Sequence, residues 1–269
     1  MVNGYAGKYL DVNLTDNSIR TFSVDMDLAR KLVGGLIYGL YLLWHRTDPG
    51  VEPKSPENLL IFSTGPISGL AGTSRGTVIF KSPLTGLIGH SECGGHWTSE
   101  LKFAGYDGIM FSGKAEEPVY LYLKDEQAEL RSAKTLYGKP TSQTEQAIIK
   151  ELNEPFVSVL SIGPAGEHLC GEACIVHAGF HAFARTGGGC VMGSKNLKAV
   201  ALRGTKGFPS VADQEKCHEL LYNTAMHAKS DVMRKALWGS STFGTQANQV
   251  ARALLLQRPR YKSRKKCLI

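Results

Sequence analysis

The sequence predicts an α+β fold in which strands dominate, helices are few and the two do not alternate regularly. Short apolar runs divided by Gly and Pro are typical of β-strands, and they occupy 58–69, 76–83, 107–114, 118–125, 156–163 and 198–204. The missing alternation argues against a doubly wound sheet. The chain has 30 glycines in 269 residues, many in pairs and clusters, which indicates positive φ or close backbone approach at many positions.

The remaining elements follow from local patterns. A β-hairpin is expected at 9–24, where apolar and polar residues alternate around a Thr-Asp-Asn-Ser turn. Asp25 is placed to cap one helix over 26–45, in which apolar residues recur every three to four positions. A second helix is predicted over 142–152, with Ser142 opening a capping box.

The net charge of +7 is concentrated at the end of the chain. Six basic residues lie in 258–267, and the rest of the chain carries only +1. A nearly neutral body does not favour nucleic acid as a partner, and the basic tail offers one aromatic residue, Tyr261, without a nucleic-acid-binding motif. Six cysteines without a Cys-x-x-Cys pair, and a start without a signal peptide, predict free thiols in a cytoplasmic protein. No apolar run reaches the roughly 18 residues of a membrane span.

The stretch 88–108 concentrates residues that could carry chemistry, and it allows three interpretations. These residues are His90, Glu92, Cys93, Gly94, Gly95 and His96. A nucleophilic thiol at Cys93 would need a base such as His96, and the alternative is a small buried cysteine beside a tight turn. A metal site lacks the second ligand pair that zinc motifs show. In the third interpretation, backbone amides of the glycine pair bind an anion before a helix over 98–103 that Thr98 caps.

Two further loops combine glycine with arginine. In 184–200, Arg185 precedes three consecutive glycines without the residue order of a P-loop, so the loop is either an anion cradle or a flexible turn. In 72–77, Arg75 stands among small residues between two strands, where a lone arginine is usually a surface residue. Three such loops between strands would together suit a large anionic cofactor laid across a sheet.

Five segments occur in the order in which a known family has them: 57–69, 81–95, 100–123, 161–169 and 191–206. On these motifs the chain resembles, from about residue 4 to about residue 210, the N-terminal domain of the aldehyde:ferredoxin oxidoreductase family. The resemblance implies an α+β domain with two related β-sheets and a few helices. It also implies a tungsten- or molybdenum-bis-pterin cofactor with a bridging magnesium, whose phosphates are held by backbone groups and arginines.

The same resemblance implies roles for residues of the 72–77 loop and of the 88–108 stretch. Arg75 matches an arginine between the cofactor and an iron–sulfur cluster. Glu92 matches a position, usually Asn or Asp, whose backbone carbonyl lies near the magnesium. Gly94 and Gly95 match the glycine pair beside it.

The segment 180–188, which overlaps the start of the 184–200 loop, matches a family segment that contacts the cofactor phosphates and the magnesium. Its implied cofactor-binding residues are His181, Ala182, through its backbone carbonyl toward the magnesium, and Arg185. The loop departs from the family pattern at three places: His181 replaces an arginine, Phe183 replaces a small residue, and Thr186 replaces a glycine. No catalytic residue is implied within this chain.

The resemblance also implies a division of the chain. Residues 1–210 form the cofactor-binding domain, 211–257 begin a helical second domain with a helix to about residue 235, and 258–269 form an unstructured basic tail. In the family, later domains supply the four cysteines of a [4Fe–4S] cluster and the substrate channel, and the Cys-x2-Cys-x3-Cys run is absent here. A truncated or frameshifted reading is expected rather than a genuine basic tail.

The implied function is the cofactor-binding portion of an oxidoreductase that oxidises aldehydes to carboxylic acids, with ferredoxin as electron acceptor and homodimer formation as in many family members. The alternative is a non-catalytic fragment, or an anion- or pterin-binding module, that lacks the iron–sulfur domain. On either interpretation, backbone groups at Glu92, Gly94 and Gly95 are expected to contact the bound cofactor or anion. Cys93 and His96 are expected neither to ligate metal nor to attack substrate.

Overall fold

A computed structural model of the chain describes residues 3–70 and 75–228. The chain divides into two compact units, Met1–Val211 and Ala212–Ile269. In the second unit the described element is helix α7 (Gln214–Ala228), where the Asp213 carboxylate accepts the Lys216 amide at 2.9 Å. The helix expected from residue 211 is therefore present in its first part. The expected continuation to 257 and the basic tail at 258–269 lie outside the described residues.

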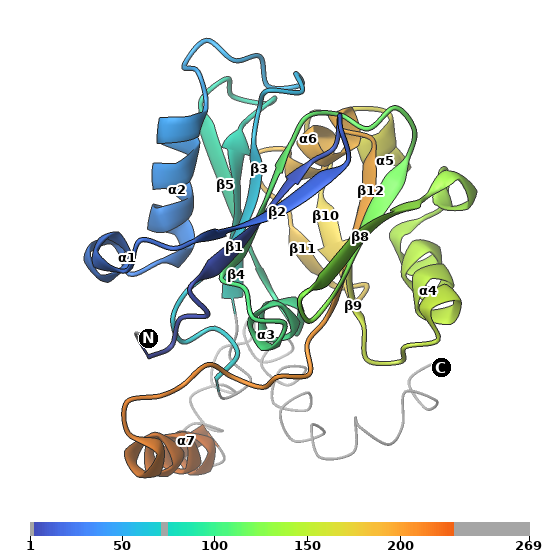
Figure 1. Cartoon of the computed structure of the whole chain (residues 1–269). Coiled ribbons are helices and arrows are strands. Elements are labelled where there is room, and N and C mark those ends of the chain that lie inside the picture. The colour runs from blue at the N-terminus through green and yellow to red at the C-terminus, as the bar shows by residue number, and fades with distance from the viewer. Residues whose placement is uncertain (1–2, 71–74, 229–269) are drawn as a thin grey trace, which may run out of the picture. The chain divides into compact units, whose positions relative to one another are not determined.

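The first half of the larger unit forms a six-stranded mixed sheet in the order β2-β1-β6-β3-β4-β5 (Figure 1). Its strands are β1 (Lys8–Asn13), β2 (Ser18–Ser23), β3 (Leu60–Thr64), β4 (Arg75–Lys81), β5 (Ile88–Gly94) and β6 (Gly108–Ser112). Its helices are α1 (Met26–Leu32), α2 (Gly35–Arg46) and α3 (Trp97–Phe103). Helices α1 and α2 lie on one face, where Tyr38 and Leu42 pack with Ile61 and Ile79.

The second half forms another six-stranded mixed sheet, in the order β8-β7-β12-β9-β10-β11. Its strands are β7 (Val119–Lys124), β8 (Gln127–Ser132), β9 (Ser158–Ser161), β10 (Ile175–His177), β11 (His181–Phe183) and β12 (Leu197–Arg203). Its helices are the short η1 (Lys134–Leu136), α4 (Thr141–Leu152), α5 (Pro164–Glu167) and α6 (Gly188–Ser194). Helix α4 covers the outer face of this sheet through Ile148, which packs with Val159 and Ala201.

The two sheets repeat one topology, strand for strand, with the same parallel and antiparallel pairings. One row of cross-strand neighbours in each sheet defines the correspondence. In the first sheet the row is Glu92, Thr77, Ser63, Gly108 and Tyr9. In the second it is Ala182, Val176, Ser161, Ala199 and Tyr120. Residues at matching places in these rows are equivalent, so the prediction of two related sheets is confirmed.

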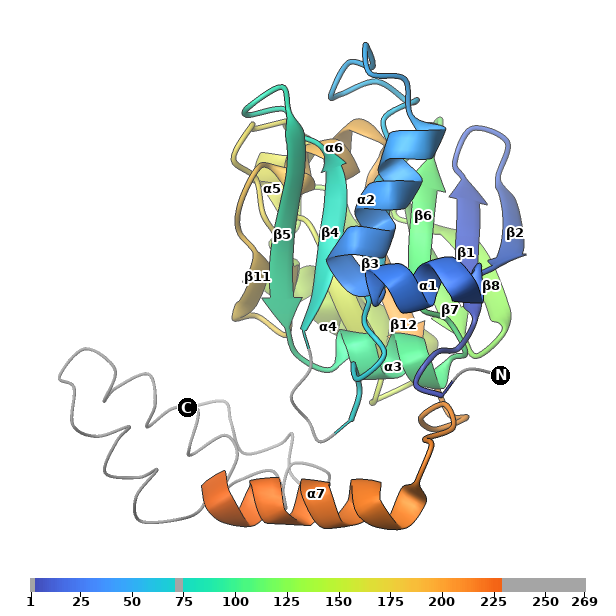
Figure 2. The same cartoon turned by 90° about the vertical axis from the view of Figure 1, so that its left-hand side faces the viewer.

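The facing surfaces of the two sheets share one hydrophobic core. Phe62 from the first sheet and Phe183 from the second lie 5.8 Å apart, ring centroid to centroid, in an edge-to-face arrangement. Trp97 at the start of α3 stands 5.5 Å from Phe183 and 6.1 Å from Phe62. The result is a layered arrangement of helices, sheet, sheet and helix (Figures 1 and 2). No helix among residues 3–70 and 75–228 is long and apolar enough to span a membrane.

The hairpin at the start and its helix cap are confirmed, but the helix after them is interrupted. The Asp25 carboxylate accepts the amides of Asp27 and Leu28 at 3.0 Å each. The single helix expected over 26–45 is wrong, because Val33 (φ 62°) and Gly34 (φ 94°) take positive φ values between α1 and α2. Gly34 and Gly35 lie at this break, which turns α2 onto the sheet.

The predicted strands are confirmed, but four others have no strong sequence signal. These are β5, β8, β10 and β11. The predicted cap at Ser142 is wrong: α4 begins at Thr141 after Pro140, and Thr144 donates its hydroxyl to the Pro140 carbonyl at 3.0 Å. A proline before the helix starts it without a capping side chain, since its fixed φ is compatible with helix entry.

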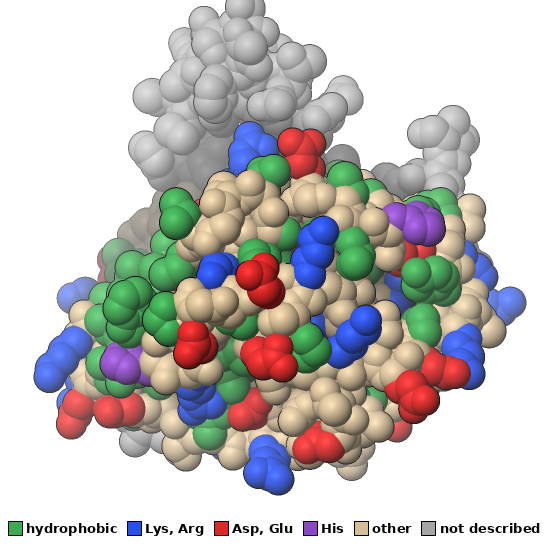
Figure 3. Space-filling model, turned by 90° about the horizontal axis from the view of Figure 1, so that it is seen from above, with side chains coloured by type: hydrophobic (Ala, Val, Ile, Leu, Met, Phe, Trp, Pro, Cys, Tyr) green, Lys and Arg blue, Asp and Glu red, His purple; other side chains and the backbone are tan. Residues whose placement is uncertain are grey.

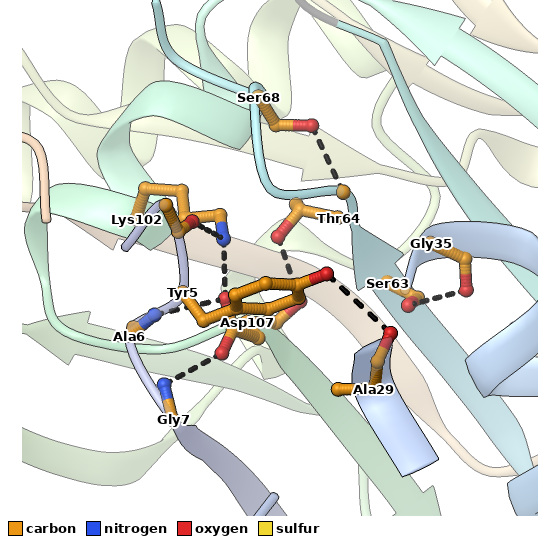
Figure 4. Close-up of polar contacts among 12 residues, drawn as sticks. Tyr5, Ala6, Gly7, Ala29, Gly35, Ser63, Thr64, Ser68, Lys102 and Asp107 are labelled. Atoms are coloured by element: carbon orange, nitrogen blue, oxygen red, sulfur yellow. Dashed lines mark hydrogen bonds and ion pairs between the residues drawn. The ribbon is translucent and has the colours of Figure 1, made fainter. Parts of the chain in front are cut away.

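A buried ion pair ties the N-terminal segment to α3 and to the start of β6. Lys102 and Asp107 are both buried and form a hydrogen-bonded ion pair (Figure 4). Asp107 also accepts the amides of Ala6 and Gly7 at 3.1 and 2.7 Å, and Lys102 donates to the Gly4 carbonyl at 3.0 Å. The pair thus satisfies backbone groups of a segment that is not itself a strand.

Candidate functional site

The candidate site lies where edge strand β5 of the first sheet meets edge strand β11 of the second (Figure 2). Hydrogen bonds join the two edges along the loop after β11. The Arg185 amide donates to the Ser91 hydroxyl at 3.2 Å, and the Thr186 hydroxyl donates to the His90 carbonyl at 3.0 Å. Ser82 then holds the Thr186 carbonyl at 2.7 Å. Two loops that are far apart in the sequence therefore form one surface.

All seven sequence-predicted site residues belong to the elements that build this junction. Arg75 begins β4, Glu92 and Gly94 lie in β5, and Gly95 follows β5 directly. His181 and Ala182 lie in β11, and Arg185 is in the loop after it. Their roles toward a cofactor are not tested by this placement and remain predictions.

Glu92 and Ala182 occupy equivalent positions in the internal repeat, at the ends of the two matching rows of strand neighbours. The His90 carbonyl accepts the Thr186 hydroxyl and so points away from β4. Alternate residues of a strand direct their carbonyls to the same side, so the Glu92 carbonyl also points to the edge of the sheet. Both residues thus lie on edge strands, where one side of the backbone is free of sheet pairing.

The outer face of β5 is open beside Arg75. Helix α2 packs over β3 and β4. The side chains of Arg75, at the start of β4, and of Glu92, on β5, are exposed at 74% and 47%. The Arg75 guanidinium lies 3.6 Å from the Glu92 carboxylate. Ser68 donates its hydroxyl to the Arg75 carbonyl at 3.2 Å, which fixes the backbone where β4 begins. The exposed ion pair between Arg75 and Glu92 is screened by solvent and contributes little to stability.

Cys93 points into the core, on the opposite side of β5 from Glu92. Burial raises the pKa of its thiol to about 12, although the charge of Arg75 opposes the shift. A thiol with this pKa is protonated at neutral pH and is not a nucleophile. His90 and Glu92 are exposed on the other face of the strand, so strand alternation separates the three side chains. Among the described residues, no group of three or more His, Cys, Asp or Glu side chains is arranged to hold a metal.

The Gly94–Gly95 turn leads into α3 in a way that the sequence did not predict. The N-cap of α3 is His96, and Thr98 lies inside the first turn, so Thr98 is not the cap. Gly95 has φ 101°, and a Cβ atom there would lie 2.4 Å from Cδ2 of His177. The His96 amide donates to Nε2 of His177 at 3.2 Å and is therefore already bonded. Glycine is required at 95 by conformation and by contact with a histidine.

The glycines after Arg185 are explained by helix packing. A Cβ atom at Gly187 would lie 2.1 Å from the Gly171 carbonyl oxygen, and one at Gly193 would lie 1.9 Å from the Gly166 carbonyl oxygen. The Gly189 amide donates to the Ala173 carbonyl at 2.9 Å. These small residues let α6 approach α5 and the segment before β10, and the Gly189 amide is not available to an anion.

The three departures from the family pattern have different consequences. Phe183 is fully buried in the core between the sheets, so its bulk does not obstruct the exposed side of β11. Thr186 adopts φ 62°, a conformation that glycine tolerates better, and its hydroxyl bonds to the His90 and Arg185 carbonyls. His181 stacks with its ring 6.1 Å from that of His177. Arg185 stays exposed and donates to the Ala184 carbonyl at 3.2 Å.

Sequence reasoning missed the residues that hold the junction together: Ser82, Ser91 and His177. Their partners are 104, 94 and 81 positions away in the sequence. No local motif marks such contacts. The alternation of small and polar residues in 88–94 was the available signal for β5.

The oxygen donors of the junction fit the cation that the resemblance implies. Magnesium prefers oxygen ligands, and backbone carbonyls supply them without a side-chain cluster. The absence of a side-chain ligand set among the described residues is therefore compatible with a cation held by the Glu92 and Ala182 carbonyls. Exposed Arg185, in the loop after β11, suits a phosphate group.

Comparison with known proteins agrees with this arrangement. Residues 9–204 match the family model described as the aldehyde ferredoxin oxidoreductase N-terminal domain. The chain is 46% identical over 230 residues to the tungsten-containing aldehyde ferredoxin oxidoreductase of Pyrococcus abyssi, which covers 85% of this chain and 38% of that protein. The enzyme of the same name from Pyrococcus furiosus is 47% identical over 215 residues, covering 79% and 35%.

Two further relatives carry different names. The aliphatic sulfonate oxidoreductase WOR-like subunit of Pyrococcus furiosus is 35% identical over 232 residues, covering 81% of this chain and 37% of that protein. The solved active site complex BamBC of benzoyl coenzyme A reductase has a TM-score of 0.81 and 42% identity, covering 86% of this chain and 36% of that chain. This chain thus spans little more than a third of each of these relatives. It belongs to the aldehyde ferredoxin oxidoreductase family, whose N-terminal domain its larger unit matches.

Proposed function

We propose that this chain is the cofactor-binding portion of an oxidoreductase that converts aldehydes to carboxylic acids, with ferredoxin as electron acceptor. The equivalence of Glu92 and Ala182 in the internal repeat carries the proposal. The tungsten- or molybdenum-bis-pterin cofactor that the resemblance implies would bring two similar pterin halves and a magnesium ion. A site made from two equivalent strand edges suits such a group.

In this proposal each residue of the junction binds or orients the cofactor. The Glu92 and Ala182 carbonyls would hold the magnesium, and Gly94, Gly95 and His181 would bind the pterin phosphates. Arg185 would neutralise phosphate charge, and Arg75 would lie between the cofactor and an iron–sulfur cluster. The bound cofactor would supply the redox chemistry, and the chain would supply its position and electrostatic surroundings. The cluster ligands and substrate channel would lie in the part of the relatives that this chain does not span.

The surface of α2 supports contact with further protein. Ile37, Tyr41 and Trp44 lie on one exposed stripe of the helix, with Trp44 70% exposed. Figure 3 shows apolar side chains gathered on the flank where α2 lies in Figure 1. Contiguous exposed apolar surface of this kind marks protein contacts.

A second candidate is the same cofactor-binding role in an enzyme that acts on another substrate. The 42% identity with the benzoyl coenzyme A reductase complex is close to the 46% identity with the aldehyde enzyme. The third candidate is a pterin- or anion-binding module without catalysis. All three share the junction of β5 and β11.

The proposal is tested by metal and pterin content. The full chain is produced with tungstate or molybdate, purified without chelators and measured by mass spectrometry of the metal and fluorescence of the released pterin. We expect bound tungsten or molybdenum with two pterins per metal. The Arg185→Gln variant should lose most of it, because a charge-assisted phosphate contact is removed.

Arg20→Gln is the matched control, since Arg20 is exposed on β2, the strand at the far edge of the same sheet as β5. It should keep the wild-type content, as should Cys93→Ala. A wild-type chain with metal no higher than the background of an unrelated protein would contradict cofactor binding by this chain. Metal content that supports aldehyde oxidation after addition of the remaining domains would favour the first candidate over the other two.

A further inference from the structure

The imidazole of His177 forms hydrogen bonds to both halves of the repeat, next to the turn that follows β5. His177 is the last residue of β10 and is 2% exposed. Its Nδ1 lies 3.0 Å from the Val159 carbonyl oxygen on β9, in its own sheet. Its Nε2 lies 3.2 Å from the backbone nitrogen of His96, in the turn between β5 and α3 of the other half.

These two partners determine the tautomer. A carbonyl oxygen can only accept a hydrogen bond, so Nδ1 carries the proton. A backbone amide can only donate, so Nε2 carries the lone pair. The ring is therefore neutral and protonated at Nδ1, and both contacts require this form.

The ring also supports the glycine before His96. A Cβ atom at Gly95 would lie 2.4 Å from Cδ2 and 2.8 Å from Nε2 of His177, so the Gly95 backbone rests against the imidazole. The equivalent residue in the first half is Val78, which pairs with Phe62 as His177 pairs with Leu160. Valine cannot form either hydrogen bond, so this link exists once, at the turn that follows Glu92 and Gly94.

We propose that His177 is a positioning residue of the cofactor site. As the Nδ1-protonated tautomer it anchors the Gly95–His96 turn to β9, and so sets the position of the β5 edge that carries the Glu92 carbonyl relative to β11. The inference rests on the proposed function for the cofactor, while the anchoring of the turn stands on the geometry alone.

Two variants separate hydrogen bonding from packing. His177→Phe keeps a planar ring of similar size and removes both hydrogen bonds. His177→Gln keeps one donor and one acceptor at similar spacing and should restore them. Leu10→Ala, in the core on β1 near the opposite edge of the first sheet from β5, is the control for a general loss of stability.

The first measurement is hydrogen exchange and NMR of the full chain without cofactor. Long-range proton–nitrogen spectra should show Nδ1 protonated and Nε2 unprotonated in the wild type. His177→Phe should speed exchange of the His96 amide by about five- to tenfold, the loss of one hydrogen bond, while the Gln and Leu10→Ala variants should not. An Nε2-protonated ring, or equal exchange in wild type and His177→Phe, would overturn the anchoring.

The second measurement is metal retained per folded chain. His177→Phe should retain about a fifth or less of the wild-type amount, and His177→Gln should recover it. Equal retention by His177→Phe, or an equal loss in Leu10→Ala, would overturn the positioning role. A wild-type chain without metal would instead count against the proposed function, and the exchange result would then decide whether His177 anchors the turn.

Discussion

Cys93 is a core residue, although in the sequence it stands between an acidic residue and a glycine pair. Burial raises the pKa of its thiol to about 12, and only a thiolate reacts with iodoacetamide at a useful rate. We therefore expect no labelling of Cys93 at about pH 8 and a rate that rises as the pH approaches 12. Peptide mass spectrometry measures this, with exposed Cys170 in the same sample as the reactive control. Labelling of Cys93 at the rate of Cys170 would contradict the buried assignment.

At the scale of single residues, the sequence identified the positions but not what their side chains do. Glu92, Gly95 and Arg185 were found from motifs. That Gly95 meets His177, and that Cys93 turns inward, depends on strands β5 and β10, which were not predicted from the sequence. A backbone carbonyl is also present at every residue, so a site built from carbonyls has no signature in residue types.

Between α1 and α2, Val33 adopts a backbone conformation that is unfavourable for valine. Val33 is the C-cap of α1 with φ 62°, and its side chain is exposed. A left-handed conformation costs a non-glycine residue about 1–2 kcal/mol. Val33→Gly should therefore stabilise the chain by up to about 1 kcal/mol, since added flexibility of the unfolded chain offsets part of the gain.

Urea unfolding followed by circular dichroism measures this change. Val33→Ala is the matched control, because it removes the branched side chain but keeps Cβ and the conformational cost. An equal gain in both variants would show that side-chain exposure, and not the left-handed backbone, determines the effect.

At the scale of elements, the long apolar strands were predictable and the two edge strands of the site were not. Strands β3, β4 and β12 carry buried apolar residues that stand out in any window. Strand β5 alternates small and polar residues, and β10 and β11 have three residues each. Three residues are too few for a periodicity, and an exposed edge does not need an apolar face.

The larger unit consists of two halves with the same strand topology. Each half contains a buried ion pair, and the acidic and basic residues exchange places between the two pairs. Asp107 precedes Gly108 and pairs with Lys102, while Lys198 precedes the equivalent Ala199 and pairs with Glu167. Both pairs satisfy backbone groups as well as each other. The same place in the fold thus accepts either sign of charge when a buried partner of opposite sign is available.

Removing one partner should therefore be costly. Asp107→Ala leaves the Lys102 ammonium buried without its carboxylate, which typically costs about 3–5 kcal/mol of unfolding free energy. Burial already lowers the pKa of Lys102 against the opposing effect of Asp107. In the variant the folded state binds its proton less tightly than the unfolded state, so the loss of stability should shrink as the pH rises toward about 10.

Urea unfolding across this pH range tests the prediction. Asp27→Ala, which breaks the exposed pair with Arg30, is the control and should change stability by less than about 1 kcal/mol. A cost for Asp107→Ala as small as that of the control, or one independent of pH, would refute the account of the buried charge.

By itself, the sequence determined the α+β class, most strands, the Asp25 cap and, through motifs in family order, the family and the candidate residues. These depend on local periodicity and on residue identity, which are readable along the chain. Only the tertiary structure decided how the strands of the two sheets pair, that β5 and β11 meet, and that Glu92 and Ala182 are equivalent. Those properties arise from pairing and packing between residues 81 to 104 positions apart. The free energy of such contacts depends on the whole fold and leaves no pattern in the segment that makes them.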